Sequence, residues 1–327
     1  MSGKADWGSA PSMRPPRVTA IVLNWNGLAD TRACLASLRA QDYKTLSLIV
    51  VDNASSDGSA AALRAEFADL TLRCNGKNLG YTGGNNPAIG AALADGADYV
   101  WLFNNDAAAA PDVLGRLVAA AEADPRIGLI SPLIGHAGGG CEFAGGLIDV
   151  ARGTWRTTAD PAQGRAWQER HPDRFVPTGT ALLLRRGLVE RIGLLDDRFF
   201  AYWEDTDYGL RSLAAGFRNH LAFDVLAGHA PKPPPSAGLG RPHYYYLMAR
   251  NEILFWRKHL GKRAARPVFW ALRRQMRLAA ASRHNRATVD SIMAGIWDGL
   301  LNRGGAYDPT RRMPAPARAL LAVLPVS

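Results

Sequence analysis

Three short polar motifs and one glycine-rich segment follow apolar runs in the first third of the chain. Asn104-Asn105-Asp106 closes the run 99–103, and similar motifs begin at Asn24 and Asp52. The Gly/Asn-rich segment covers residues 75–85. An acid at the carboxyl end of a buried strand lies where open α/β sheets place their ligands, and it can hold a divalent cation against a diphosphate. Each motif alone also fits a plain turn, because Asn, Asp and Gly favour turns.

A second group of candidate residues follows the aromatic segment 199–203. Glu204, Asp205 and Asp207 come directly after it and begin an expected helix. Carboxylates favour helix N-termini, so a capping role is one interpretation. The other is that the apolar segment raises the basicity of one carboxylate and suits it to remove a proton.

His229 follows an expected strand at residues 219–226. A histidine in such a place is more often incidental than a ligand. Together with Asp106 it would form a mixed nitrogen and oxygen site suited to Mn²⁺ or Mg²⁺.

Alternating strand and helix patterns predict the sheet that would position these residues. We expect strands at 18–24, 46–51, 70–74 and 99–103, with helices at 28–40, 59–67 and 85–94 and another after Pro111. This alternation predicts an α/β fold with a doubly wound parallel sheet and right-handed crossovers. Neither G-x-G-x-x-G after the first strand nor G-x-x-x-x-G-K-[ST] occurs, which disfavours dinucleotide binding and P-loop hydrolysis.

The positive charge of the chain is concentrated at its C-terminal end. The net charge is +10, but residues from Arg241 onward carry 16 Lys/Arg against 4 Asp/Glu, so residues 1–240 are close to neutral. We expect a disordered tail at 1–17, a catalytic domain at 18–240 and a basic, aromatic-rich helical region at 241–327. The last region suits an anionic membrane surface, nucleic acid, or simple packing on the main domain.

The remaining composition favours a cytoplasmic protein. Three widely spaced cysteines form no C-x-x-C pair, the N-terminal tail has no apolar signal region, and no segment reaches about 18 uninterrupted apolar residues. The expected location is the cytoplasm, with peripheral association at the inner face of the cell membrane as one interpretation of the basic region.

Taken in order, the motifs resemble family 2 inverting glycosyltransferases with a GT-A fold, in the branch that includes bacterial rhamnosyltransferases. The resemblance covers about residues 18–260. It implies a Rossmann-like, mostly parallel sheet flanked by helices, a nucleotide-sugar donor and a divalent cation, Mg²⁺ or Mn²⁺. The segments that carry it are TAIVLNWNG, VVDNASSDGS, NLGYTGGNN, FNNDAAAAPDVL, TGTALLLRR, residues 199–211 and the lone His229.

The family pattern also assigns roles to residues of these motifs. It makes Asp205 the catalytic base, Asp106 and His229 the metal ligands, and Asp52 a contact of the nucleoside. Asn104 stands where many members have Asp, so we expect a weaker contact near the ribose, and the four alanines after Asp106 leave no neighbouring acid to share the cation. The other substrate-binding candidates are Asn24, Asn26, Asn78, Gly80, Asn104, Asn105, Trp203 and Glu204.

The expected reaction is transfer of a sugar from dTDP-rhamnose or a UDP-sugar to a hydroxyl group of a cell-surface polysaccharide or lipid-linked acceptor. A bound dication neutralises the leaving diphosphate, and a carboxylate removes the proton of the attacking hydroxyl. The main alternative is a non-catalytic nucleotide-sugar or carbohydrate-binding module on the same fold. We expect no nucleic-acid partner, and a nucleotidyltransferase would need a basic, Gly-rich signature after the first strand.

Overall fold

The computed structural model describes residues 14–136, 139–230, 242–282 and 284–310. Most of the expected tail at 1–17 and the expected domain boundary at 240 lie outside the described residues. The chain divides into two compact units. Unit 1 comprises residues 1–148, 156–195 and 208–231, and unit 2 comprises 149–155, 196–207 and 232–327.

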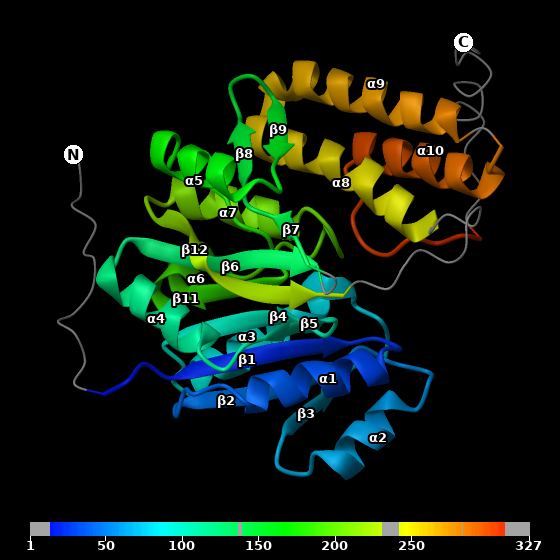
Figure 1. Ribbon diagram of the computed structural model, residues 1–327. Helices are drawn as coiled ribbons and strands as arrows, with labels where there is room; N and C mark the ends of the chain where they lie inside the picture. Colours follow the sequence, from blue (N-terminus) through cyan, green and yellow to red (C-terminus); the bar gives the residue numbers. More distant parts are fainter. Residues whose placement is uncertain (1–13, 137–138, 231–241, 283, 311–327) are drawn as a thin grey trace. The chain divides into compact units, whose positions relative to one another are not determined.

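The strands and helices alternate along most of the chain (Figure 1). Their bounds are β1 Val18–Asn24, α1 Leu28–Arg39, β2 Leu46–Asp52, α2 Ser59–Glu66, β3 Thr71–Cys74, α3 Gly80–Ala94, β4 Tyr99–Asn104, β5 Ala107–Ala109, α4 Val113–Ala123, β6 Ile127–His136, β7 Cys141–Phe143, β8 Gly146–Asp149, β9 Thr154–Thr157, α5 Pro161–Arg170, β10 Phe175–Val176, β11 Ala181–Arg185, α6 Arg186–Ile192, α7 Glu204–Ala214, β12 Arg218–His229, α8 Pro242–Leu260, η1 Gly261–Ala264, α9 Ala265–Ala281 and α10 Arg286–Leu300.

The main sheet confirms the predicted α/β fold class. Among the described residues it has nine strands in the order β3-β2-β1-β4-β11-β6-β12-β5, with β7 paired to β6. The first four strands are mutually parallel, β11 runs against β4 and β6, and β12 is parallel to β6. The carboxyl ends of β1, β2, β4, β6 and β12 therefore lie at the same edge of the sheet.

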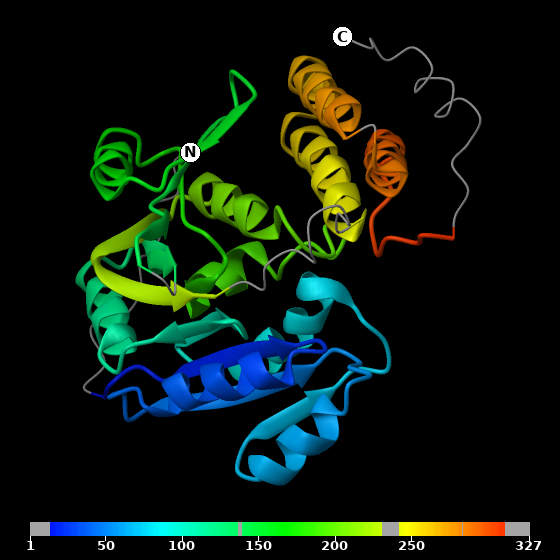
Figure 2. The same ribbon diagram turned by 45° about the vertical axis from the view of Figure 1, so that its right-hand side comes forward.

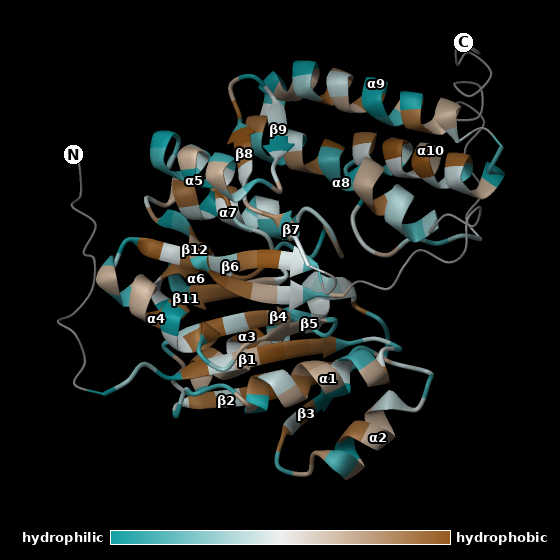
Figure 3. Cartoon of the chain, in the orientation of Figure 1, coloured by the Kyte–Doolittle hydropathy of each residue, from teal (hydrophilic) through white to brown (hydrophobic). Residues whose placement is uncertain are grey.

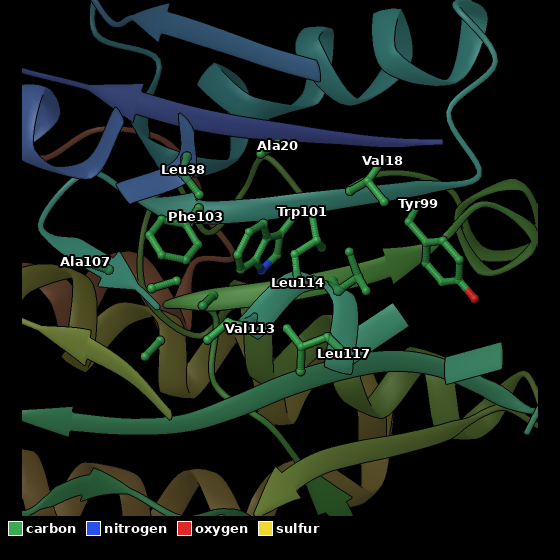
Figure 4. Close-up of a cluster of buried hydrophobic side chains, with 14 of the residues drawn as sticks. Val18, Ala20, Leu38, Tyr99, Trp101, Phe103, Ala107, Val113, Leu114 and Leu117 are labelled. Carbon is green, nitrogen blue, oxygen red and sulfur yellow. The ribbon is translucent and has the colours of Figure 1, made fainter. Parts of the chain in front are cut away.

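Apolar side chains alternate between the two faces of this sheet and form a core on each. One core joins the sheet to α1, α2 and α4, and the other joins it to α3 and α6. Figure 4 shows Trp101 and Phe103 of β4 among the side chains of β1 and α4. Their ring centroids are 4.7 Å apart in an edge-to-face arrangement, which is a favourable geometry for a pair of aromatic rings. The buried strands thus fix the positions of the polar residues at their ends.

Helix α3 begins earlier than the sequence pattern predicts. We expected a helix from residue 85, but it starts at Gly80 and includes much of the Gly/Asn-rich segment. The small residues allow it to approach β1 closely, since a Cβ added to Gly84 would lie 2.6 Å from the Leu23 side chain. Packing against the sheet therefore outweighs the low helix propensity of these residues.

Unit 2 contains the bundle of α8, α9 and α10, which are the yellow to red helices in Figure 2. The aromatic residues of this basic region divide into two groups. Tyr246, Phe255 and Trp256 of α8 are buried, whereas Phe269 and Trp270 of α9 are 58% and 43% exposed. The sequence left packing on the protein and binding to another surface as alternatives. The bundle contains both buried aromatic residues, which pack internally, and exposed ones.

Candidate functional site

The ends of β1 and β2 are joined by the side chains of Asn24 and Asp52. These residues are register partners in the two parallel strands, and both are buried. Asn24 Nδ2 donates to Asp52 Oδ1 at 2.8 Å and to Ser55 Oγ at 3.0 Å, while Asn24 Oδ1 accepts from Thr31 Oγ1 at 2.8 Å. The network holds the loop after β2 against the loop after β1, where Asn26 N also donates to Ser55 Oγ.

Both loops contain a left-handed residue that is not glycine. Asn26 has φ 52° and Ala54 has φ 62°. Such conformations are costly for residues with a Cβ and occur often at ligand sites. Asn26 Oδ1 accepts from Ser56 N at 2.7 Å, so the predicted site residue Asn26 helps to hold this arrangement.

Asn53 connects β2 to the segment that contains Asn78 and Gly80. Its buried side chain donates to Asn78 Oδ1 at 2.9 Å and to Gly80 O at 3.0 Å, and its Oδ1 accepts from Leu79 N at 3.1 Å. We did not single out Asn53 from the sequence, although it directly follows the candidate Asp52. Its amide is the connection that brings two predicted site residues to the strand ends.

The third polar motif lies against the first. Asn105 Nδ2 donates to Thr31 Oγ1 at 3.1 Å, and Asn104 extends β4 by one residue beyond the predicted end. A Cβ added to Gly27 would lie 2.6 Å from Asn105 Nδ2. A side chain at position 27 would displace the Asn105 amide, so Gly27 permits the observed approach of the first and third motifs.

Asp106 and His229 are brought together by the pairing of β5 with β12. Ala107 lies opposite His229 in this antiparallel pair, and Ala230 N donates to Asp106 O at 2.9 Å. Asp106 Oδ1 consequently lies 3.3 Å from His229 Nε2. The alanines after Asp106 thus form the strand that places its carboxylate beside the histidine.

Glu142 is a further acid beside His229. No motif surrounds it in the sequence, so the sequence did not indicate it as a site residue. Its Oε2 lies 2.8 Å from His229 Nδ1. Burial lowers the pKa of His229, but hydrogen bonds with Asp106 and Glu142 outweigh burial and the net shift is upward. A carboxylate on Nδ1 orients an imidazole so that Nε2 faces a metal, which is a common arrangement in metal sites.

The donor atoms at this position fit a divalent cation bound jointly with a ligand. Asp106 supplies a carboxylate oxygen, and His229 supplies a nitrogen whose ring is oriented by Glu142. Among the described residues, no three His, Cys, Asp or Glu side chains form a complete protein cage. Mg²⁺ is usually held in such a way, by one or two protein ligands with substrate phosphates and water.

The acids of α7 lie in contrasting surroundings within unit 2. Glu204 is 8% exposed, and its buried Oε2 has no hydrogen-bond partner among the described residues. Burial, with a smaller effect of the Asp205 carboxylate, raises the pKa of Glu204 to about 8. Asp205 is only partly buried, and its Oδ1 accepts from Thr206 N at 2.6 Å. Trp203, at 7% exposure, packs between Trp155 and Phe255.

Comparisons with known proteins identify the family of the chain. The family model "Glycosyl transferase family 2" matches residues 19–193. N-acetylglucosaminyl-diphospho-decaprenol L-rhamnosyltransferase of Mycobacterium tuberculosis (strain ATCC 25618 / H37Rv) is 28% identical over 269 residues, covering 75% of this chain and 85% of that protein. The dTDP-rhamnosyl transferase RfbF of Shigella flexneri is 21% identical over 253 residues, covering 74% and 80%.

A solved structure shows the same fold. The mannosyltransferase PcManGT from Pyrobaculum calidifontis, in complex with GDP-Man and Mn²⁺, gives a TM-score of 0.53 at 22% identity, covering 98% of this chain and 82% of that chain. The fold is that of GT-A glycosyltransferases. The chain therefore belongs to glycosyl transferase family 2, in its rhamnosyltransferase-like branch.

Proposed function

We propose that this glycosyltransferase moves rhamnose from dTDP-rhamnose, with a UDP-sugar as the second candidate donor, to a hydroxyl group of a lipid-linked or cell-surface polysaccharide precursor. The relatives named for rhamnosyl transfer support the sugar, and one of them is named for a decaprenol-linked acceptor. The observation that carries the proposal is the 3.3 Å distance between Asp106 Oδ1 and His229 Nε2. Asp106 lies in the turn between β4 and β5, and His229 is the last residue of β12.

In this proposal Asp106 and His229 hold the divalent cation, Mg²⁺ or Mn²⁺. When bound, the cation neutralises the negative charge that develops on the nucleoside diphosphate leaving group. Glu142 orients the His229 ring through Nδ1. Asn24, Asp52 and Asn78 form the nucleoside side of the site, supported by their hydrogen bonds at the ends of β1 and β2.

Asp205 acts as the base in a single displacement that inverts the anomeric centre. The acceptor hydroxyl gives its proton to a carboxylate as its oxygen attacks, which requires an ionised carboxylate at working pH. Glu204 does not meet this requirement at neutral pH, because burial raises its pKa to about 8. Glu204 and Trp203 then shape the acceptor side of the loop.

The test is a binding and product screen with purified full-length protein. Thermal shift with dTDP, UDP and GDP, each with and without Mn²⁺, identifies the nucleotide, and a ligand at about 100 times its Kd stabilises by about 2.7 kcal/mol. NMR of the product then gives the anomeric configuration. Asp106→Asn should abolish the Mn²⁺-dependent shift, with the exposed Glu169→Gln as control. Binding without transfer to any acceptor would favour the non-catalytic module, and no metal-dependent nucleotide binding would refute the proposal.

We also propose that α9 associates with the anionic inner face of the cell membrane, beside a lipid-linked acceptor. Figure 3 shows hydrophilic and hydrophobic residues alternating along this helix. Its exposed side carries Phe269, Trp270 and Leu278 among arginines, and α9 contains no acid. Each basic residue near an anionic surface contributes about 1 kcal/mol, and interfacial aromatics add apolar contact. No described helix is long and apolar enough to cross a bilayer.

Substitution on α9 tests this better than truncation, because α10 packs on both α8 and α9. Phe269→Ser with Trp270→Ser should lower binding to vesicles containing phosphatidylglycerol by about tenfold or more, since two inserting side chains are lost. Activity on a soluble acceptor analogue should not change. Equal vesicle binding by the wild type and the double variant would refute the membrane role. Salt-sensitive binding to RNA without binding to vesicles would indicate a nucleic-acid surface.

A further inference from the structure

The loop of residues 198–203, which leads into Glu204 and Asp205, has an unusual backbone. Phe200, Tyr202 and Trp203 have φ values of 65°, 68° and 73°. They are three of the six described non-glycine residues with positive φ. Left-handed conformations are unfavourable for residues with a Cβ, so surrounding contacts must hold them in place. We call this segment the 198–203 loop.

Arg250 of α8 binds the start of this loop. The side chain is fully buried, and its Nη2 donates to Phe199 O at 2.8 Å and to Arg198 O at 3.1 Å. Its Nε donates to Asn251 Oδ1 at 2.8 Å, which fixes the neighbouring amide group. A buried guanidinium is costly unless its donors are satisfied, and here most of them serve backbone carbonyls.

Asn251, the next residue of α8, binds the rest of the loop. Its Nδ2 lies 2.9 Å from Phe199 O, 2.7 Å from Ala201 O and 2.7 Å from Tyr202 O. The buried Asn251 amide nitrogen is therefore within hydrogen-bond distance of the carbonyls on both sides of the left-handed Phe200. It is also within this distance of the carbonyl of the left-handed Tyr202. This geometry favours the observed backbone over an extended one, in which the three carbonyls would not converge.

The C-terminal end of α8 binds the helix that follows the loop. Asp207, in the first turn of α7, is fully buried, and its carboxylate lies 2.7 Å from Lys258 Nζ and 2.8 Å from His259 Nε2. Asp207 N donates to Trp203 O at 2.8 Å. The segment that contains Asp205 is therefore held before and after by residues of one helix.

We propose that Arg250 and Asn251 are positioning residues that fix the direction of the Asp205 carboxylate by holding the 198–203 loop in its left-handed conformation. The proposal rests on the proposed role of Asp205 as the base. The basic C-terminal region is then part of the catalytic apparatus through two buried residues, independently of any membrane contact of α9.

The experiment combines hydrogen exchange with a double-mutant cycle in the full chain. Asn251→Ala should raise amide exchange at Ala201 and Asp207 by tenfold or more, because their hydrogen bonds lie within the held segment. It should lower kcat by tenfold or more while the KM of the nucleotide-sugar donor changes less than twofold. In an Asp205→Asn background, Asn251→Ala should cause no further loss of kcat, since the two residues act through the same step.

The control is Gln275→Ala, which removes a buried amide from the same bundle. Gln275 donates to Glu252 of α8 at 3.1 Å, so its loss should leave both loop exchange and kcat unchanged. Donor binding by calorimetry gives the number of sites per chain and detects a partly unfolded preparation. If Asn251→Ala does not fold, Asn251→Ser retains a donor and should show the same changes at smaller size.

Two results would overturn the positioning role. Unchanged exchange in Asn251→Ala would show that the loop holds its conformation without this amide. A loss of kcat that multiplies the loss in Asp205→Asn would show that Asn251 acts independently of Asp205. Normal turnover of Asp205→Asn itself would refute the base assignment of the proposed function, whereas the exchange data would still report whether the loop is held.

Discussion

Replacing Glu204 with glutamine should change how stability depends on pH. The substitution keeps the side-chain volume and removes the titrating proton. In the native protein Glu204 is almost fully buried, and its Oε2 has no partner in the part of the chain that the structure describes. Burial together with Asp205 and Asp207 raises the pKa of Glu204 to about 8. An unfolded glutamate titrates near 4.3. Between these two pH values the native state therefore binds one more proton than the unfolded state.

The sign and size follow from linkage. Stability falls as pH rises wherever the native state binds more protons, by about 1.4 kcal/mol per pH unit for one proton. Over the window from about pH 4.5 to about pH 8 the ceiling is about 5 kcal/mol. Relaxation and water penetration reduce the penalty of buried charges, so we expect about 2 kcal/mol. Glu204→Gln should lack this loss and should be more stable than the wild type at pH 8.

Urea unfolding at pH 5, 6, 7 and 8 measures the effect. The difference in unfolding free energy between Glu204→Gln and wild type should grow toward high pH, whereas the exposed control Glu169→Gln should run parallel to wild type. Parallel curves for Glu204→Gln would refute the reasoning, because they would show that Glu204 titrates alike in both states. Transfer activity should persist in this variant, since the neutral side chain is already the native form at pH 7.

Three further predictions follow from other contacts. Asp205→Asn should leave donor affinity nearly unchanged and lower turnover by roughly 10²-fold or more, and normal turnover alongside loss in Glu204→Gln would move the base by one residue. Glu142→Ala should weaken Mn²⁺ binding with nucleotide, measured by calorimetry, by about 10–100-fold, and unchanged affinity would contradict the orienting role. Hydrogen bonding to Arg126 lowers the pKa of Asp124 to about 2. Asp124→Asn should therefore lower the free energy of unfolding at pH 7 but not near pH 2, where the wild type has itself lost this stabilisation. An equal effect at both pH values, measured by urea unfolding, would exclude this role of Asp124.

Long apolar runs made the N-terminal half of the sheet predictable. The bounds of β1 agree with the predicted strand, β2 ends one residue later than expected and α1 ends one residue earlier. The short strand β5 was not predicted, because Ala107–Ala109 has low β propensity and pairs only where β12 provides the partner. That unpredicted pairing is what sets the distance between Asp106 and His229, which the sequence placed only at neighbouring strand ends.

Residues that act through other residues were harder to find. Glu142 lies 87 positions before His229, in a strand of three residues with no motif around it. Asn251 begins the stretch NEILFWRKHLGKR, whose arginines and aromatics suggested an amphipathic surface helix. Its first six residues, 251–256, are buried instead. The composition indicated a basic helix, but only the three-dimensional contacts show that the side-chain amide of Asn251 faces the 198–203 loop.

The positive charge of the C-terminal region therefore does not describe one surface. Arg250 is buried against backbone carbonyls, and Arg257 Nη1 donates to the carbonyls of Gly299 and Leu300 at the end of α10. Lys258 pairs with Asp196 and Asp207. These cations have internal partners, so they add little to the attraction of an anionic bilayer. Arg274 of α9 likewise pairs with the buried Glu252, whereas Arg266, Arg273 and Arg277 lie at the surface of α9. Neutralising Arg266, Arg273 and Arg277 should thus affect vesicle binding without changing turnover, and changes at Arg250 or Asn251 should affect turnover without changing vesicle binding.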